Sequence, residues 1–202
     1  MRHRIEALRQ SSASIALFLE YIPQNLHEWL GVQVSAGDEA ASLALTMVEK
    51  ELRAGTSFMN ARGLLHFDAH FENILTDGQH LYFADYGLAI SSRFELSQDE
   101  SRFFERHLTY DRCYTATHLV LWLATALYGC EGADRDALVR TWSEGERPSG
   151  IPAAAAAILT RYAPLAAVMS DFYRKLQRQS KNTPYPLEKI RQLDGINSSS
   201  TG

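Results

Sequence analysis

The chain has 202 residues, of which 46% are hydrophobic and 22% are charged, and its formal net charge is -4. These values fit a globular protein of one substantial domain or two small lobes, and they argue against disorder over most of the length. The acidic balance leaves no basic footprint, so nucleic acid is not expected as a partner.

The two cysteines, Cys113 and Cys130, lie in or beside an apolar helical segment without the spacing of a metal site. This pattern predicts free thiols in a reducing compartment. The apolar run 15–19 is too short for a signal sequence, and no stretch approaches the roughly 20 apolar residues of a membrane-spanning helix. We therefore expect a cytoplasmic protein without a membrane partner.

The N-terminal quarter predicts one strand and two helices. Residues 14–22 form an apolar run that is stopped by Pro23, as expected for a buried strand that leads into a connector. Residues 24–30 carry apolar side chains at helical spacing. A long amphipathic helix is expected from about 39 to 61, with Asp38 as its N-cap.

The later segments predict a hairpin and then a series of helices. Short strands at 73–76 and 80–83 are expected to pair across Asp77-Gly78, and residues 88–99 are expected to form an exposed loop. Helices are expected at about 111–128, 134–146, 153–162, 164–179 and 187–193, the first of them buried. The fold class is thus mainly α-helical with a small β-hairpin.

A cluster of polar residues between Leu64 and Gly87 carries the clearest chemical signal. The order H-x-D-x-x-x-x-N, then a hairpin, then D-x-G places an aspartate, an asparagine and a second aspartate along the chain. In phosphoryl transfer, one aspartate orients and deprotonates the acceptor hydroxyl, while an asparagine and another aspartate hold Mg²⁺. The spacing provides these groups in that order.

The segment HFDAHFENIL followed by FADYGLA resembles the catalytic loop and metal-binding turn of the protein-kinase-like superfamily. This superfamily includes eukaryotic-type protein kinases and small-molecule kinases of the aminoglycoside phosphotransferase type. The resemblance implies a kinase-like C-terminal lobe, ATP and Mg²⁺ as cofactors, and transfer to a hydroxyl of a small molecule or protein. His70 stands where serine and threonine kinases usually carry lysine, which favours a small-molecule or atypical kinase.

Specific roles follow from the resemblance. It implies Asp68 as the catalytic base and His66 as the residue that braces the loop against the Asp85 turn. Asn73 and Asp85 would be the Mg²⁺ ligands, and His70 would lie on the substrate side.

The resemblance also implies a hinge and a domain division. Glu20, Tyr21 and Ile22 would form the hinge, whose backbone groups bind adenine. Asp111, at the start of the buried helix, would tie down the backbone of the catalytic loop. Residues 1–23 would be a remnant of the small lobe and hinge, residues 24–193 the large lobe, and residues 194–202 a disordered tail.

The sequence departs from the family in one respect. The small lobe of the family supplies a glycine-rich phosphate cover and a lysine, whereas the first glycine here is Gly31 and the first lysine is Lys50. We expect that a partner protein could supply the missing lobe. A catalytically inactive, kinase-derived binding module is the alternative that this departure favours.

A metal-dependent hydrolase is the remaining alternative. His66, Asp68 and His70 alternate in a way that could ligate zinc or manganese, with Asp85 as a fourth group. This interpretation leaves Asn73 and the D-x-G turn without a role, so phosphoryl transfer is the preferred hypothesis.

Overall fold

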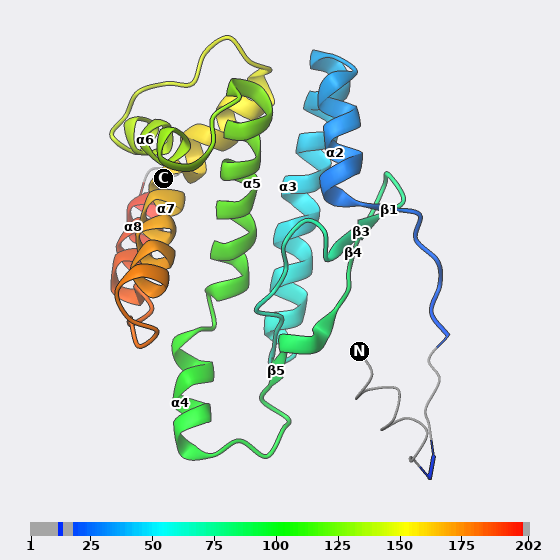
Figure 1. Ribbon diagram of the computed structural model, residues 1–202, viewed down its shortest axis with the longest axis vertical. Coiled ribbons are helices and arrows are strands. Elements are labelled where there is room, and N and C mark those ends of the chain that lie inside the picture. Colours follow the sequence, from blue (N-terminus) through cyan, green and yellow to red (C-terminus); the bar gives the residue numbers. More distant parts are fainter. Residues whose placement is uncertain (1–11, 14–17, 200–202) are drawn as a thin grey trace.

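The computed structural model describes residues 12–13 and 18–199 and confirms a mainly helical chain with a small antiparallel sheet (Figure 1). The elements are, in chain order, β1 (Gln24–Asn25), α2 (Leu26–Ser35), α3 (Asp38–Ala61), β2 (Leu64–Leu65), β3 (Ile74–Thr76), β4 (Leu81–Phe83), the 3-10 turn η1 (Tyr86–Leu88), β5 (Ile90–Ser91), α4 (Gln98–Arg106), α5 (Tyr110–Tyr128), α6 (Gly132–Ser143), α7 (Ala153–Arg178) and α8 (Leu187–Ser199).

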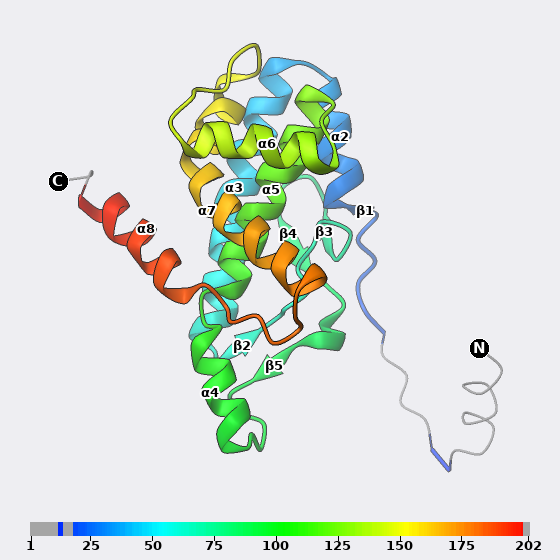
Figure 2. The same cartoon turned by 60° about the vertical axis from the view of Figure 1, so that its left-hand side comes forward.

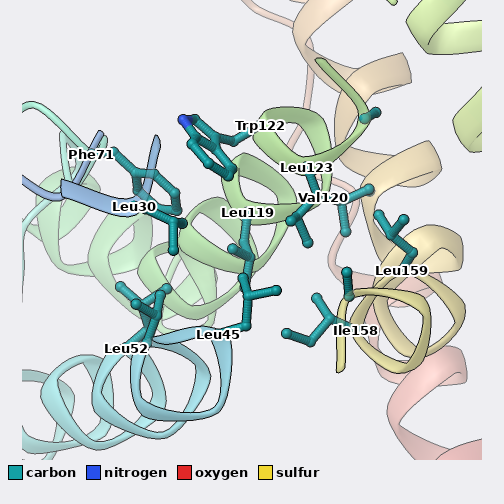
Figure 3. Packing of buried hydrophobic residues seen from close by; sticks show 14 of the residues in the cluster. Leu30, Leu45, Leu52, Phe71, Leu119, Val120, Trp122, Leu123, Ile158 and Leu159 are labelled. Carbon is teal, nitrogen blue, oxygen red and sulfur yellow. The ribbon is translucent and has the colours of Figure 1, made fainter. Parts of the chain in front are cut away.

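The core forms around α5, which stands between α3 on one side and α7 on the other, while α6 lies across one end of the pair α5 and α7 (Figures 1 and 2). The face of α5 toward α3 carries Leu119, and Val120 and Leu123 lie toward α7 (Figure 3). These side chains are at most 1% exposed. Burial of each stabilises the fold by about 2 kcal/mol, so α5 is buried as its apolar pattern predicts.

Two small sheets position the loop of interest. The hairpin of β3 and β4 forms across Asp77, whose carboxylate accepts hydrogen bonds from the N–H groups of Gln79 and His80 at 2.8 and 2.7 Å. The first sheet has the order β1-β3-β4. In the second sheet, β2 pairs with β5, so that Leu64 lies opposite Ser91. The pairing of β2 with β5 therefore brings together the two ends of the intervening segment, residues 66–89.

The buried strand expected at 14–22 is wrong over the part that can be assessed. Residues 18–23 have no regular secondary structure, and Phe18, Leu19 and Tyr21 are 95, 85 and 83% exposed. Residues 14–17 lie outside the described residues. An apolar run becomes a buried strand only where a sheet edge is available, and the edge of β3 is taken by Gln24–Asn25 alone.

Several helices also differ from expectation. Residues 88–99, expected to form a loop, end in the first residues of α4, a helix that was not predicted and that begins with a capping box between Ser97 and Glu100. The two helices expected around Pro164 are one helix, α7, because burial of Ala163 and Ala166 offsets the one hydrogen bond that proline removes. The last helix continues through Ser199, past the expected end at 193.

Among the described helices, only α7 has the length and the apolar composition that would allow a helix to cross a membrane. This differs from the expectation that no stretch reaches such a length. About a third of its most apolar window (33%) is buried, and Ile158 and Leu159 belong to the core. A core helix meets the same criterion.

Candidate functional site

Asp111 holds the start of the loop at residues 66–73, which carries Asp68 and Asn73. Its carboxylate is 3% exposed and accepts hydrogen bonds from the backbone N–H groups of His66 at 2.6 Å and Phe67 at 2.9 Å. Burial raises the pKa of Asp111, while the two backbone hydrogen bonds act in the opposite direction. The contact expected between the start of the buried helix and the loop backbone is confirmed.

Phe67 adopts a left-handed backbone conformation, with φ of 64°. This conformation costs a bulky residue about 1 kcal/mol or more. The rings of Tyr110 and Phe103 lie 4.9 and 5.6 Å from the Phe67 ring, centroid to centroid. Together with Asp111, these contacts hold the strained turn that places His66 and Asp68 on either side of Phe67.

His66 is fully buried and joins the loop to the turn that carries Asp85. Its Nε2 lies 2.9 Å from the backbone oxygen of Ala84, and its Nδ1 lies 3.3 Å from the backbone nitrogen of Asp68. A carbonyl only accepts, so Nε2 carries the proton and donates, and Nδ1 accepts from Asp68. The neutral ring thus uses both nitrogens within the protein, in the bracing contact that the resemblance implies.

Asp68 and Asn73 are half-buried and bonded to each other. The Nδ2 group of Asn73 donates to the backbone oxygen of Asp68 at 3.0 Å and to its Oδ2 at 3.2 Å. The amide nitrogen of Asn73 is therefore committed to Asp68. The amide oxygen is the atom of Asn73 that a cation would bind.

The Asp85 turn is exposed and shaped by the glycine that follows it. Asp85 has φ of 56°, and its Oδ1 accepts from the N–H of Gly87 at 3.3 Å. A Cβ atom at Gly87 would lie 3.1 Å from the same oxygen, so a larger residue would crowd the carboxylate. Tyr86, between them, places its ring 4.6 Å from that of His66.

His70 lies between two carboxylates. Its Nδ1 is 2.8 Å from Oε2 of Glu72, and its Nε2 is 3.8 Å from Oδ1 of Asp68. Burial raises the pKa of Glu72, but its backbone hydrogen bond together with His70 and His27 lowers it overall. The sequence analysis assigned no role in the site to Glu72 or His27. The alternation of polar residues at 68, 70 and 72 was the signal available for Glu72.

Phe71 anchors the loop in the core. It is fully buried beside Leu30 and Trp122 (Figure 3), and its backbone oxygen accepts from the N–H of His27 at 3.4 Å. The loop therefore alternates a buried apolar residue with polar residues on the open side. This alternation directs Asp68 and His70 away from the core.

The residues expected to form a hinge are not packed in this way. Glu20 and Tyr21 are exposed and Ile22 is half-buried. The pKa of Tyr82 is raised mainly by its hydrogen bond to Asp77 and also by the charge of Glu20, so Glu20 lies beside the hairpin. Within the described part of the chain, no hydrogen bond joins residues 20–22 to the loop at residues 66–73.

Two cavities accompany this site. The larger, about 1130 Å³, lies between α4, the end of α7 and the segment before α8. The smaller, about 400 Å³, lies between α5, α6 and α7. Neither is lined by Asp68, Asn73 or Asp85, although Phe67 borders the larger one.

The zinc or manganese alternative fits the geometry poorly. It needs His66, Asp68 and His70 around one ion, but both ring nitrogens of His66 are hydrogen-bonded within the protein. Over residues 12–13 and 18–199, no three or more His, Cys, Asp or Glu side chains are arranged to hold a metal ion.

No known protein family and no curated protein matches this chain. Any functional assignment therefore rests on its own residues and contacts.

Proposed function

We propose that this chain is the large lobe of a kinase-like protein that transfers the γ-phosphoryl group of ATP to a hydroxyl, with Mg²⁺ as cofactor. One observation carries the proposal. His66 spans from the loop to Ala84, immediately before Asp85, at 2.9 Å. This bond ties the loop that holds Asp68 and Asn73 to the turn that holds Asp85, so the three oxygen-bearing side chains belong to one unit.

Asp68 would be the general base. Its Oδ2 is occupied by Asn73, and its Oδ1 is on the side of His70. The hydrogen bond from Asn73 fixes the carboxylate, which would orient the acceptor hydroxyl and take its proton. The position of His70, whose Nε2 lies 3.8 Å from this oxygen, supports a small-molecule acceptor, as the sequence favours.

Asn73 and Asp85 would hold Mg²⁺. Their free groups are an amide oxygen and a carboxylate, and Mg²⁺ prefers oxygen donors and needs few protein ligands, because it keeps waters and substrate phosphates. When bound, the ion neutralises charge on the transferred phosphate. The donor set of the turn and loop thus fits this cation.

The adenine end of the site would use the backbone of residues 20–22, whose amide and carbonyl groups form no hydrogen bond with the described chain. The phosphate clamp would come from a partner protein. The exposure of this segment also favours a second candidate, a kinase-derived module that binds a ligand without turnover.

Release of phosphate from ATP, with water as acceptor, tests the proposal. Mg²⁺-dependent release by the parent protein is expected to fall roughly 100-fold in Asp68→Asn, because the general base is lost. Asp134→Asn, an exposed carboxylate on α6, is the matched control and should match the parent. Equal rates in Asp68→Asn and Asp134→Asn would refute the assigned base. Binding of ATP without any release would favour the second candidate.

A further inference from the structure

The smaller cavity, about 400 Å³, has an unusually polar wall. It is bounded by one face of α5, the start of α6 and the second half of α7. The residues that matter for its chemistry are Tyr114, Thr117, Arg135, Ser170, Arg174 and Arg178.

Buried polar atoms without partners converge on this cavity. In the described part of the chain, the buried side-chain atoms that lack a hydrogen bond are Oγ1 of Thr117, Nε of Arg135 and Oγ of Ser170. All three residues line the cavity. Thr117 is only 2% exposed, and each unsatisfied buried group costs about 1–3 kcal/mol. Three such groups around one cavity indicate that a bound polar ligand provides their missing hydrogen-bond partners.

The charge of the wall selects an anion. Three arginines face a single acidic residue, Asp136, although the whole chain carries a net charge of -4. Arg174 is paired with Asp171, whereas Arg135 and Arg178 form no ion pair with a described residue. Burial lowers the pKa of His118, also in the wall, to about 4, so this ring adds no charge at neutral pH. Guanidinium groups match carboxylate and phosphate oxygens.

The cavity adjoins the catalytic loop. The pKa of Tyr114 is raised to about 12, mainly by burial and also by the charges of Tyr110, Asp68 and Glu72. The ring of Tyr114 stacks on that of Tyr110 at 5.7 Å, and the Tyr110 ring lies 4.9 Å from the ring of Phe67, the residue before Asp68. The His118 ring lies 4.6 Å from the ring of Phe71, the buried residue that anchors the loop in the core.

We propose that this cavity binds the anionic group, a carboxylate or a phosphate, of a small-molecule acceptor whose hydroxyl reaches Asp68. The role of the hydroxyl rests on the proposed function; the anion site rests on the arginines and hydroxyls of the wall. The larger cavity does not compete for this role, because no buried unpartnered side-chain atom of the described residues lines it.

The test uses the whole chain without nucleotide or Mg²⁺. Inorganic phosphate and acetate are titrated separately at constant ionic strength, with binding followed by calorimetry. Saturable binding of either anion is expected, with affinity on the order of tenfold lower in Arg135→Gln. Arg140→Gln removes the same charge from the exposed side of the same helix and should bind as the parent does. The anion that binds identifies the chemistry of the guest.

Thr117→Val provides a second variant of nearly equal shape in case Arg135→Gln does not fold. This variant should also bind the anion more weakly, because it removes a hydroxyl group that lines the site. Absence of saturable binding by both anions, or equal affinities in Arg135→Gln and Arg140→Gln, would overturn the proposal. Anion binding without ATP turnover would refute the proposed function alone, and turnover without anion binding would refute the anion site alone.

Discussion

The catalytic loop and the segment before β1 belong to the same proposed site, yet the chain holds them very differently. The loop is fixed by a buried carboxylate, a buried histidine and a buried phenylalanine, Asp111, His66 and Phe71. Residues 18–22 are mostly exposed and make no backbone hydrogen bonds to the described chain. This chain therefore preorganises the proposed base and metal ligands, but not the proposed adenine end of the site.

The largest expected effect comes from breaking the anchor of the loop. Asp111→Ala leaves the N–H groups of His66 and Phe67 buried without an acceptor, so the free energy of unfolding should fall by roughly 2–5 kcal/mol. Urea denaturation measures this change. Asp134→Ala, on the exposed start of α6, should cost less than about 0.5 kcal/mol. Similar losses in the two variants would show that Asp111 is not an anchor.

Protonation of His118 should loosen the packing behind the loop. Its pKa is lowered by burial to about 4, below its ordinary 6.5, so the unfolded chain takes up more protons between these values. The stability contribution is fully present above pH 6.5 and is lost as the pH falls toward 4, by on the order of 3 kcal/mol.

Denaturation curves at several pH values measure this dependence. His118→Gln should flatten the curve between pH 6.5 and 4, and His80→Gln, an exposed histidine of the hairpin, should leave it unchanged. An unchanged pH dependence of stability in His118→Gln would show that His118 does not cause it.

Two glycine-to-alanine substitutions in helices should change the stability in opposite directions, because only one of the glycines, Gly55, packs against the hairpin. A Cβ atom at Gly55 would lie 2.3 Å from Cε2 of Phe83, so Gly55→Ala should destabilise by about 1 kcal/mol even though alanine favours helices. Gly31→Ala, in α2, meets nothing within 4 Å and should stabilise by roughly 0.5–1 kcal/mol. Thermal denaturation compares them, and stabilisation by both would mean that Phe83 moves aside freely.

The smallest effect is expected in the segment before β1. Tyr21 is 83% exposed, so Tyr21→Ser should change the free energy of unfolding by less than about 0.5 kcal/mol. Urea denaturation alongside Asp111→Ala gives the direct contrast between the two regions. A loss above about 1 kcal/mol would mean that this segment packs against the protein.

Local signals predicted much of the fold. The Asp77-Gly78 turn marked the hairpin, and the apolar run ending at Gly129 marked α5. The capping box at Ser97 was present in the sequence but lay in a polar stretch, so α4 was missed. The strand predicted at 14–22 is not formed over the described residues 18–22, because pairing depends on a neighbouring strand that the apolar run itself cannot reveal.

The candidate site, like the fold, was predicted only in part. The order of Asp68, Asn73 and Asp85 is a local pattern, and the bond from His66 to Ala84 and the hold of Asp111 on the loop agree with the roles expected of them. The position of His118 behind the loop and the arginine-lined cavity could not be foreseen. They depend on how α5, α6 and α7 pack against the loop, and no spacing within one segment encodes that arrangement.

The most direct test of the central claim is calorimetric titration of ATP with Mg²⁺ and, separately, with a chelator. We expect binding that requires Mg²⁺, that is lost in Asp85→Asn and that is retained in Asp68→Asn, because the proposed role of Asp85 is to hold the metal and that of Asp68 is to act on the acceptor. Asp134→Asn should bind as the parent does. Binding that is indifferent to Mg²⁺, or unchanged in Asp85→Asn, would contradict it.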